Sequence, residues 1–242
     1  MSSGQHASHP RLAHHFEDAE QQREAGTLGM WLFLVTEIMF FGGMFLAYAL
    51  YRGKYPQAFA MGSHELDILL GGVNTIVLIG SSLTMALAVW ASQVGRRRAL
   101  VGFLILTILL GLTFMGIKVV EYQAKFEHHL FPGESFRYDP HHGGSATETT
   151  GTPEHSNGEV TAEPDQGQVQ MFFFLYFALT GVHALHMIVG VGALVFLLVY
   201  SLRGHYSTKW HSHVELTGLY WHFVDIAWIF IFPLLYLIGR HT

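Results

Sequence analysis

Long apolar segments alternate with short polar ones along most of this chain. Five apolar segments are long enough to cross a bilayer, which takes about 20 residues of helix. They are Leu28–Tyr51, Asp67–Ser92, Ala99–Glu121, Val169–Tyr200 and Glu215–Gly239. The fourth is longer than a bilayer requires, so we expect it to tilt or to project beyond the membrane. The pattern predicts an all-α, polytopic membrane protein built as a bundle of five transmembrane helices.

Two polar stretches interrupt this pattern. Residues 1–26 lack an apolar run followed by a small-residue cleavage site, so we expect the first helix to act as an uncleaved insertion signal for a membrane domain at 27–242. The loop at about 122–168 is rich in Gly, Ser, Thr, Glu, Pro and His, which predicts a flexible insertion. Alternatively, its histidines could bind a metal ion adventitiously, but the composition favours a flexible insertion. These histidines are His128, His129, His141, His142 and His155.

Composition narrows the chemistry that the chain itself can carry. Half of the residues are hydrophobic, 13% are charged and none is cysteine. The missing cysteines exclude disulfides, thiolate iron–sulfur centres, c-type haem attachment and a cysteine-ligated dicopper centre. If the chain belongs to an electron-transfer complex, those cofactors lie in other subunits. The formal charge of −5 says little about partners, and we expect no nucleic acid among them.

The positive residues between the apolar segments predict the orientation. Lys and Arg concentrate on one side of the membrane, and by the positive-inside rule that side is cytoplasmic. The N-terminus is then cytoplasmic and the C-terminus outside. The positive residues in the short connections could also hold anionic lipid headgroups, although their role in setting the topology explains them equally well. These residues are Arg96, Arg97, Arg98, Arg203 and Lys209. The residues on this side are Arg11, Arg23, Arg96, Arg97, Arg98, Arg203 and Lys209.

Ionisable residues recur in the middle of the apolar segments. Glu37 and Asp225 lie at similar depth in the first and fifth segments, which run the same way, and His183 and His186 fall near the middle of the fourth. His222 precedes Asp225 by three residues, so the two share a helix face and could share a proton or a hydrogen bond. We expect these five residues to form one buried polar layer.

Three interpretations of this layer compete. The simplest interpretation is structural, with interhelical hydrogen bonds between polar groups that would otherwise have no partner in the membrane. A proton path or proton buffer comes second, because intramembrane ionisable residues are commonly functional. A metal site or a b-type haem between opposing histidines comes last. Carboxylate di-metal sites use Glu-x-x-His on two helices, whereas the fifth segment offers His222-x-x-Asp225 in the reverse order.

Further polar and small residues predict how the helices pack. Asn74 lies nearer the outer side of the second segment. Lys118 and Glu121, three residues apart at the outer end of the third segment, could form an ion pair near the headgroups. Trp221 is deep enough to pack within the bundle. Glycines permit close helix approach. They are Gly42, Gly43, Gly71, Gly72, Gly80, Gly111, Gly116, Gly181, Gly190 and Gly192.

Each apolar segment also carries a short motif, and the motifs in the last two segments are the most specific. The motifs are Thr36-Glu37 with Phe40-Phe41, Asn74-Thr75, Glu121-Tyr122, Thr180-Gly181 with His183 and His186, and Tyr220-Trp221-His222-Phe223-Val224-Asp225. In this order they resemble subunit III of the haem-copper respiratory oxidases, in its five-helix bacterial form. Glu37 is similar in position to the carbodiimide-reactive membrane glutamate of that family.

The resemblance implies a function. Subunit III of this family holds no redox cofactor, packs against subunit I with its haems and copper, and binds phospholipid. It supports proton uptake by subunit I, while subunit II receives electrons from cytochrome c. We therefore expect an accessory subunit of an aa3-type cytochrome c oxidase in a bacterial inner membrane, with subunits I and II and possible small subunits or a supercomplex as partners. Glu37, His183, His186, His222 and Asp225 would form its buried framework rather than a catalytic site.

The sequence is also compatible with other functions. Subunit III of a quinol oxidase is the nearest one, and a relative associated with nitric oxide reductase is more distant. From other classes, a stand-alone transporter or proton channel could use the Glu/His/Asp layer, and a stand-alone haem protein could use its histidines. Broken helices and inverted repeats typical of transporters are not evident in the sequence.

Overall fold

The computed structural model describes residues 19–127, 131, 166–203 and 212–237. Within these ranges every element is helical. The elements are α1 (Ala19–Lys54), α2 (Pro56–His64), α3 (Ile68–Gln93), α4 (Arg97–Glu127), α5 (Gln166–Leu202), α6 (Ser212–Phe232) and the π-helix η2 (Pro233–Leu237). Five helices in the described ranges are long and apolar enough to cross a membrane, counting α6 with η2 as one. The predicted fold class and number of spans are confirmed.

Helices α1, α4 and α5 extend further than the apolar segments that predicted them. α1 begins at Ala19, so the expected boundary between residues 26 and 27 falls inside a helix. α4 continues to Glu127 because its last turns still pack on the protein, where Lys125 donates a hydrogen bond to the carbonyl of Glu65. The loop predicted at 122–168 is therefore shorter at both ends. Its residues 128–130 and 132–165, including all five histidines named above, lie outside the described residues.

Local signals define the ends of α3. Asp67 caps its N-terminus, since its Oδ1 accepts hydrogen bonds from the backbone N–H groups of Leu69 and Leu70 at 2.9 and 3.2 Å. At the other end Gly95 has a φ of 74°, a conformation that glycine adopts without steric cost. This permits the tight turn into α4 and brings the two helices side by side.

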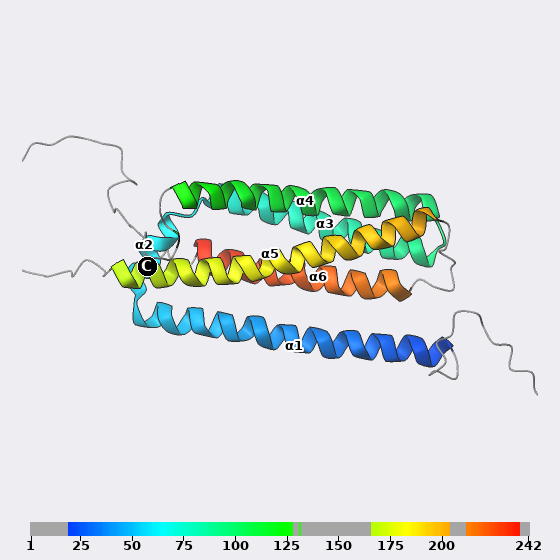
Figure 1. Cartoon of the computed structure of the whole chain (residues 1–242), viewed down its shortest axis with the longest axis horizontal. Coiled ribbons are helices and arrows are strands. Elements are labelled where there is room, and N and C mark those ends of the chain that lie inside the picture. Colours follow the sequence, from blue (N-terminus) through cyan, green and yellow to red (C-terminus); the bar gives the residue numbers. More distant parts are fainter. Residues whose placement is uncertain (1–18, 128–130, 132–165, 204–211, 238–242) are drawn as a thin grey trace, which may run out of the picture.

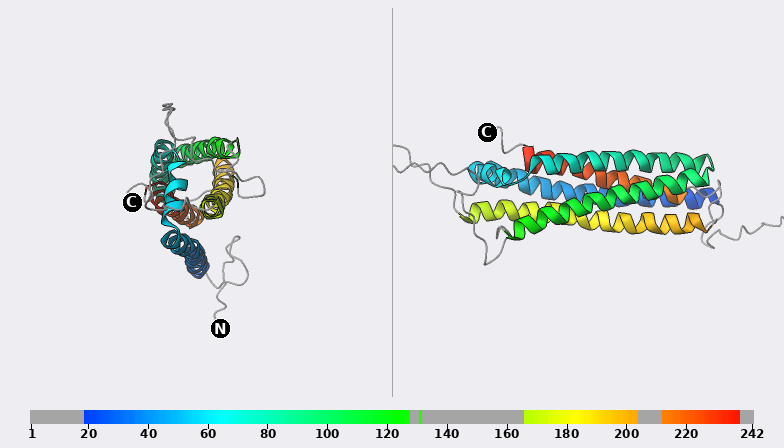
Figure 2. Two further views of the ribbon diagram at one scale, coloured as in Figure 1. Left: turned by 90° about the vertical axis from the view of Figure 1, so that its left-hand side faces the viewer. Right: turned by 90° about the horizontal axis from the view of Figure 1, so that it is seen from above.

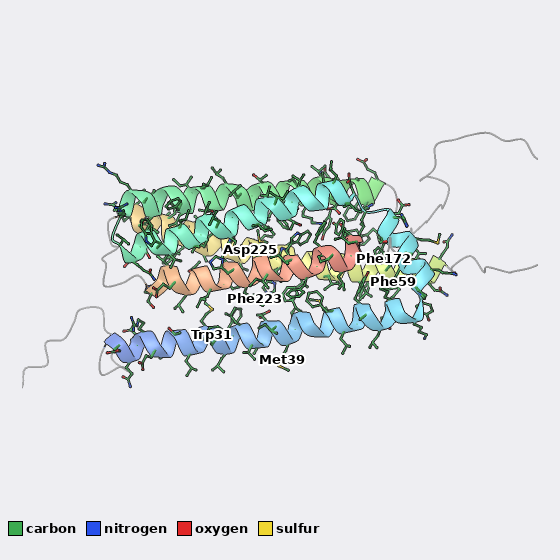
Figure 3. The ribbon with its side chains drawn as sticks, turned by 180° about the vertical axis from the view of Figure 1, so that it is seen from behind. Trp31, Met39, Phe59, Phe172, Phe223 and Asp225 are labelled. Carbon is green, nitrogen blue, oxygen red and sulfur yellow. The ribbon has the colours of Figure 1, made fainter. Side chains whose placement is uncertain are left out.

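The short helix α2 was not predicted. Pro56 is at its first position, where the missing N–H costs nothing. Phe59 of α2 packs edge-on against Phe172 of α5, with ring centroids 5.4 Å apart, and lies 5.2 Å from the ring of Tyr48. Gly62 lets α2 approach this closely, because a Cβ there would overlap the Phe172 ring. Figure 3 shows Phe59 and Phe172 together at this end of the bundle.

Helices α3, α4, α5 and α6 form a four-helix bundle, and α1 lies outside it. The end-on view in Figure 2 shows the four helices around a square and α1 beyond the corner occupied by α6. In the most apolar window of each helix, 11% of α1 is buried against 50% of the last span. Figure 1 places the start of α1, the α3–α4 turn and the end of α5 at one end, with α2 at the other.

Trp221 packs closely against two glycines of the bundle. Its indole is fully buried between α4 and α5, where a Cβ on Gly111 would lie 2.9 Å from the ring and one on Gly190 3.0 Å from it. These two positions therefore require glycine for close approach, as predicted, and Gly71 is similarly close to Phe232. At the other predicted glycines except Gly80, no heavy atom lies within 4 Å of an added Cβ, so the packing prediction is wrong there within this chain. They are Gly42, Gly43, Gly72, Gly116, Gly181 and Gly192.

Candidate functional site

Glu37 and His186 join α1 to α5 near the middle of both helices. His186 Nε2 lies 3.0 Å from Glu37 Oε2, and the side chains of His186 and Glu37 are 14% and 19% exposed. The other ring nitrogen, Nδ1, lies 2.8 Å from the carbonyl oxygen of Val182. From α6, the hydroxyl of Tyr220 donates to the backbone carbonyl of His186 at 3.0 Å. The pair thus lies where three helices meet.

His183, three residues before His186, points into a different environment. Its side chain is fully buried inside the four-helix bundle, 5.5 Å from the ring of Phe114 and 5.1 Å from the nearer ring of Trp228. Neither ring nitrogen has a hydrogen-bond partner among the described residues. His183 therefore does not share a hydrogen-bonded layer with Glu37 and His186, contrary to the prediction.

His222 and Asp225 also do not form the expected pair. His222 Nδ1 lies 2.7 Å from the hydroxyl of Ser82 on α3. Asp225 is 3% exposed, and its carboxyl oxygens have no hydrogen-bond partner among the described residues, although Ser82 lies close by. In Figure 3, Asp225 lies on the bundle side of α6 and Phe223 on the side that faces α1. The predicted single layer is thus divided between the α1 contact and the bundle interior.

Lys118 and Glu121 form the ion pair that was predicted, with Nζ and Oε2 2.8 Å apart. The two side chains are only 6% and 4% exposed, so the pair is enclosed by protein. Lys118 donates to the hydroxyl of Tyr236 at 2.7 Å and lies 4.4 Å from the ring centroid of Trp228. The hydroxyls of Tyr176 and Tyr236 both donate to Glu121. All charge in this cluster is compensated inside the bundle.

The two tyrosines of this cluster were missed by the sequence interpretation. Tyr176 lies in an apolar run of α5, and Tyr236 lies in the π-helix η2, whose extra residue per turn after Pro233 changes the direction of its side chains. The i, i+3 spacing of Lys118 and Glu121 was the only sequence signal for the cluster. It identified the ion pair but not the hydroxyls that complete it.

Further hydrogen bonds connect α3 to its neighbours in the bundle. Asn74 is fully buried and its amide nitrogen is 3.5 Å from the carbonyl oxygen of Phe114, while its own oxygen has no partner among the described residues. The indole N–H of Trp221 donates to Ser81 at 3.0 Å, and that of Trp228 donates to Thr75 at 3.1 Å. The hydroxyls on α3 therefore orient both buried tryptophans, a role that the motif in this segment did not predict.

The arginines at the α3–α4 turn have distinct environments. Arg97 donates to two backbone carbonyls at the C-terminus of α5, to Ser201 at 2.9 Å and to Leu202, so it caps that helix. Arg96 lies over the ring of Trp90 at 5.5 Å, and Arg96 and Arg98 are exposed. Arg203 follows the end of α5, whereas Lys209 and Arg11 lie outside the described residues. Arg97 is thus committed to the protein rather than free for a lipid headgroup.

The described residues contain no group of three or more His, Asp or Glu side chains that could hold a metal ion. The histidines also do not face one another across the bundle. His186 faces Glu37, His222 faces Ser82, and His183 packs between Phe114 and Trp228. These side chains do not fit a haem held between opposing histidines or a two-histidine metal site.

Comparison with known proteins gives consistent matches. The chain matches the family described as cytochrome c oxidase subunit III over residues 14–128 and 168–240. It is 28% identical to cytochrome c oxidase subunit 3 of Thermostichus vulcanus, over 93% of this chain and 92% of that protein. It is 32% identical to cytochrome c oxidase subunit 3 of Synechocystis sp., over 87% and 74%. It is also 29% identical to a probable quinol oxidase subunit 3 of Staphylococcus haemolyticus, over 88% of each.

Proposed function

Because the chain belongs to the cytochrome c oxidase subunit III family, and is thus a multi-pass subunit of a haem-copper oxidase complex, we propose that it is the non-redox accessory subunit of an aa3-type cytochrome c oxidase. In this role it stabilises the catalytic subunit I, binds phospholipid and supports proton uptake by a proton-pumping terminal oxidase of aerobic respiration. Haem and copper are then held by subunits I and II.

The observation that carries this proposal is that the intramembrane ionisable groups are paired with neighbouring side chains. The best candidates for chemistry are committed to neighbouring groups, Lys118 to Glu121 and Glu37 to His186. The chain has no cysteine, and the three histidines in the middle of the described membrane helices, His183, His186 and His222, do not converge on a common point. Such an arrangement supports a framework that positions helices and protons rather than a centre that binds oxygen or transfers electrons.

The same proposal assigns a membrane and an orientation. We place the chain in a bacterial inner membrane with the end that carries Arg96–Arg98 and Arg203 in the cytoplasm. This choice rests on the positive-inside rule and fits the shared position of the α3–α4 turn and the end of α5 in Figure 1. Arg96, which lies over the ring of Trp90, and Arg98 are both exposed, and they are the side chains we propose for contact with anionic lipid headgroups.

Purification of the chain from native membranes in mild detergent tests the proposal. We expect it to co-purify with a haem-copper subunit I and with a subunit II that carries dicopper ligands, together with haem bands in the reduced-minus-oxidised spectrum. Recovery of the chain alone, with proton flux in liposomes, would instead indicate a stand-alone channel. A Soret band in the isolated chain would contradict the assignment of haem to the partner subunits.

A quinol oxidase is the second candidate for the complex. It is favoured by the similarity to the probable quinol oxidase subunit 3 of Staphylococcus haemolyticus, which extends over 88% of both chains. The two candidates differ in subunit II, since only the cytochrome c type holds the dicopper centre. Mass spectrometry of the co-purified subunit II and copper analysis of the complex would decide between them.

A further inference from the structure

The ring of His186 is hydrogen-bonded at both of its nitrogens. Nδ1 is 2.8 Å from the carbonyl oxygen of Val182, one turn earlier on α5, and Nε2 is 3.0 Å from Glu37 Oε2 on α1. A carbonyl oxygen can only accept a hydrogen bond, so Nδ1 must carry a hydrogen. The backbone of α5 therefore fixes the hydrogen on Nδ1 and leaves the protonation of Nε2 open.

The contact with Glu37 then permits two electrically neutral arrangements, whereas an imidazolium that donates to a protonated carboxyl would carry a net positive charge, which is costly at this depth. If Nε2 carries no hydrogen, it is an acceptor, and the Glu37 carboxyl must be protonated to donate to it. If Nε2 carries a hydrogen, an imidazolium faces a carboxylate. Both arrangements contain the same number of protons and have zero net charge. An ionised Glu37 facing a bare Nε2 would instead place two acceptors 3.0 Å apart, with no hydrogen bond between them.

We infer that Glu37 and His186 form a one-proton site, in which a single proton is shared across the α1–α5 contact and the pair stays electrically neutral. The inference goes beyond the proposed function and holds for either electron donor. The contact with Val182 fixes the hydrogen on Nδ1 of His186, so the shared proton lies between Nε2 and the Glu37 carboxyl. Glu37 therefore never needs to carry an uncompensated charge in the middle of the membrane.

The surroundings of the pair favour this neutral state. The ring of Phe41 lies 5.3 Å from that of His186, and the ring of Tyr220 lies 6.5 Å from it. The titratable groups that interact electrostatically with the pair are Tyr220, whose hydroxyl is engaged with the His186 carbonyl, and His183, which faces the bundle interior. On α6, His222 faces Ser82 instead, and Asp225 lies on the bundle side. None of them donates to Glu37. Apolar surroundings make any unbalanced charge at this depth costly.

Vibrational and nuclear magnetic resonance spectroscopy of the intact purified complex test the inference. Infrared difference spectra between wild type and Glu37→Gln report whether Glu37 is a carboxylic acid or a carboxylate. Nitrogen-15 spectra of histidine-labelled complex, assigned by difference from His186→Gln, report the two ring nitrogens. We expect Nδ1 to be protonated together with either an acid and a bare Nε2, or a carboxylate and a protonated Nε2. Because the two arrangements contain the same number of protons, their ratio should not depend on pH as long as the site keeps its single proton.

Two results would overturn the inference. One is a carboxylate on Glu37 together with a neutral His186, which is a pair with net negative charge. The other is a His186 whose Nδ1 lacks the hydrogen. If Glu37→Gln fails to assemble, the shift of the Glu37 bands in His186→Gln identifies the same carboxyl group, and absence of any shift would contradict the contact.

His222 and Asp225 provide matched controls. His222 is also an intramembrane histidine, but it bonds to the Ser82 hydroxyl, and Asp225 is a buried carboxyl with no histidine partner among the described residues. Both His222→Gln and Asp225→Asn should remove their own signals and leave those of Glu37 and His186 unchanged. If either control altered the pair, Glu37 and His186 would not be the self-contained site that we infer.

Discussion

The α3–α6 bundle and α1 span the same membrane but are held in place differently. Inside the bundle, half of the most apolar window of the last span is buried and Trp221 fills the space between Gly111 and Gly190. α1 buries 11% of its window. It contacts the bundle through a line of rings, such as Phe41 on Phe223 at 6.0 Å, and through polar contacts that include the Glu37–His186 pair and a hydrogen bond from the Tyr48 hydroxyl to the Leu234 carbonyl. Because lipid is as apolar as leucine, moving apolar side chains of α1 from lipid into protein contributes little free energy to its packing. Specific contacts therefore matter more for α1.

The two pairs of ionisable side chains differ in the same way. Lys118 and Glu121 belong to one helix and are enclosed by Tyr176, Tyr236 and Trp228. Glu37 and His186 belong to different helices and remain partly exposed. The first pair must be satisfied locally for the bundle to close, whereas the second connects a helix that has few other polar contacts. Variants that affect one pair and not the other therefore separate the two kinds of packing.

The largest effect is expected from Lys118→Met. This change leaves the Glu121 charge buried without its partner, and breaking such pairs costs about 3–5 kcal/mol. The double variant Lys118→Met with Glu121→Gln removes both charges and should recover most of the stability, because the introduced amide oxygen would still accept from the tyrosine hydroxyls. Thermal dissociation of the subunit from the complex measures both. Equal stability of the single and double variants would contradict the enclosed-pair description.

Gly190→Val should have the next largest effect. The added Cβ would lie 3.0 Å from the Trp221 ring, and overpacking of this kind costs about 1–3 kcal/mol. Gly192→Val is the matched control on the same helix, because no heavy atom lies within 4 Å of its added Cβ. The midpoint of thermal dissociation should fall for Gly190→Val alone. A similar fall for both would mean that helix propensity or lipid contact, rather than Trp221, determines the effect.

A smaller effect is expected at the α1 contact. His186→Phe removes a hydrogen bond between helices, worth about 0.6–1.7 kcal/mol in membranes, whereas Glu37→Gln keeps one because its amide can donate to Nε2. Glu37→Gln should leave assembly and the haem spectrum intact and abolish carbodiimide labelling at this position. Assembly failure of Glu37→Gln would indicate a stronger structural role for this carboxyl group than we expect.

Spin labels can measure the position of α1 directly, since the chain contains no cysteine of its own. Cysteines introduced in place of Met39 on α1 and Ile226 on α6, which are 74% and 51% exposed, report the α1–α6 distance. We expect this distance to broaden in His186→Phe. The distance between Leu109 on α4, which is 55% exposed, and Ile226 is the control and should not change. Broadening of both would show that the bundle itself had loosened.

The smallest effect is expected at the C-terminus of α5. Arg97→Ala removes the side chain that caps this helix, a change worth about 0.3–1 kcal/mol at an exposed helix end. Hydrogen exchange of the amides near Ser201 should become faster, because the last turn loses its donor. Arg98→Ala is the control, and it should leave this exchange unchanged. Equal effects would mean that the charge of the turn, rather than the Arg97 hydrogen bonds, stabilises the helix end.

The sequence alone predicted which residues lie deep in the membrane, because every helix that crosses a bilayer must be long and apolar, independent of the helices it packs against. This requirement predicted the five spans, the central position of Glu37 and His186, and the pairing of Lys118 with Glu121, which only needs i, i+3 spacing on one helix. The resemblance of the motifs to subunit III was also available from the sequence, and the family match confirms it.

Only the tertiary structure decided how each helix is rotated about its axis. In a soluble protein the apolar face points inward, but in a membrane both the lipid-facing and the protein-facing sides are apolar, so the pattern does not define the rotation. Sequence alone therefore grouped His183 with His186, although the two side chains enter different environments. The π-helix that brings Tyr236 to Glu121, and the capping by Arg97, likewise depend on contacts between segments far apart in the chain.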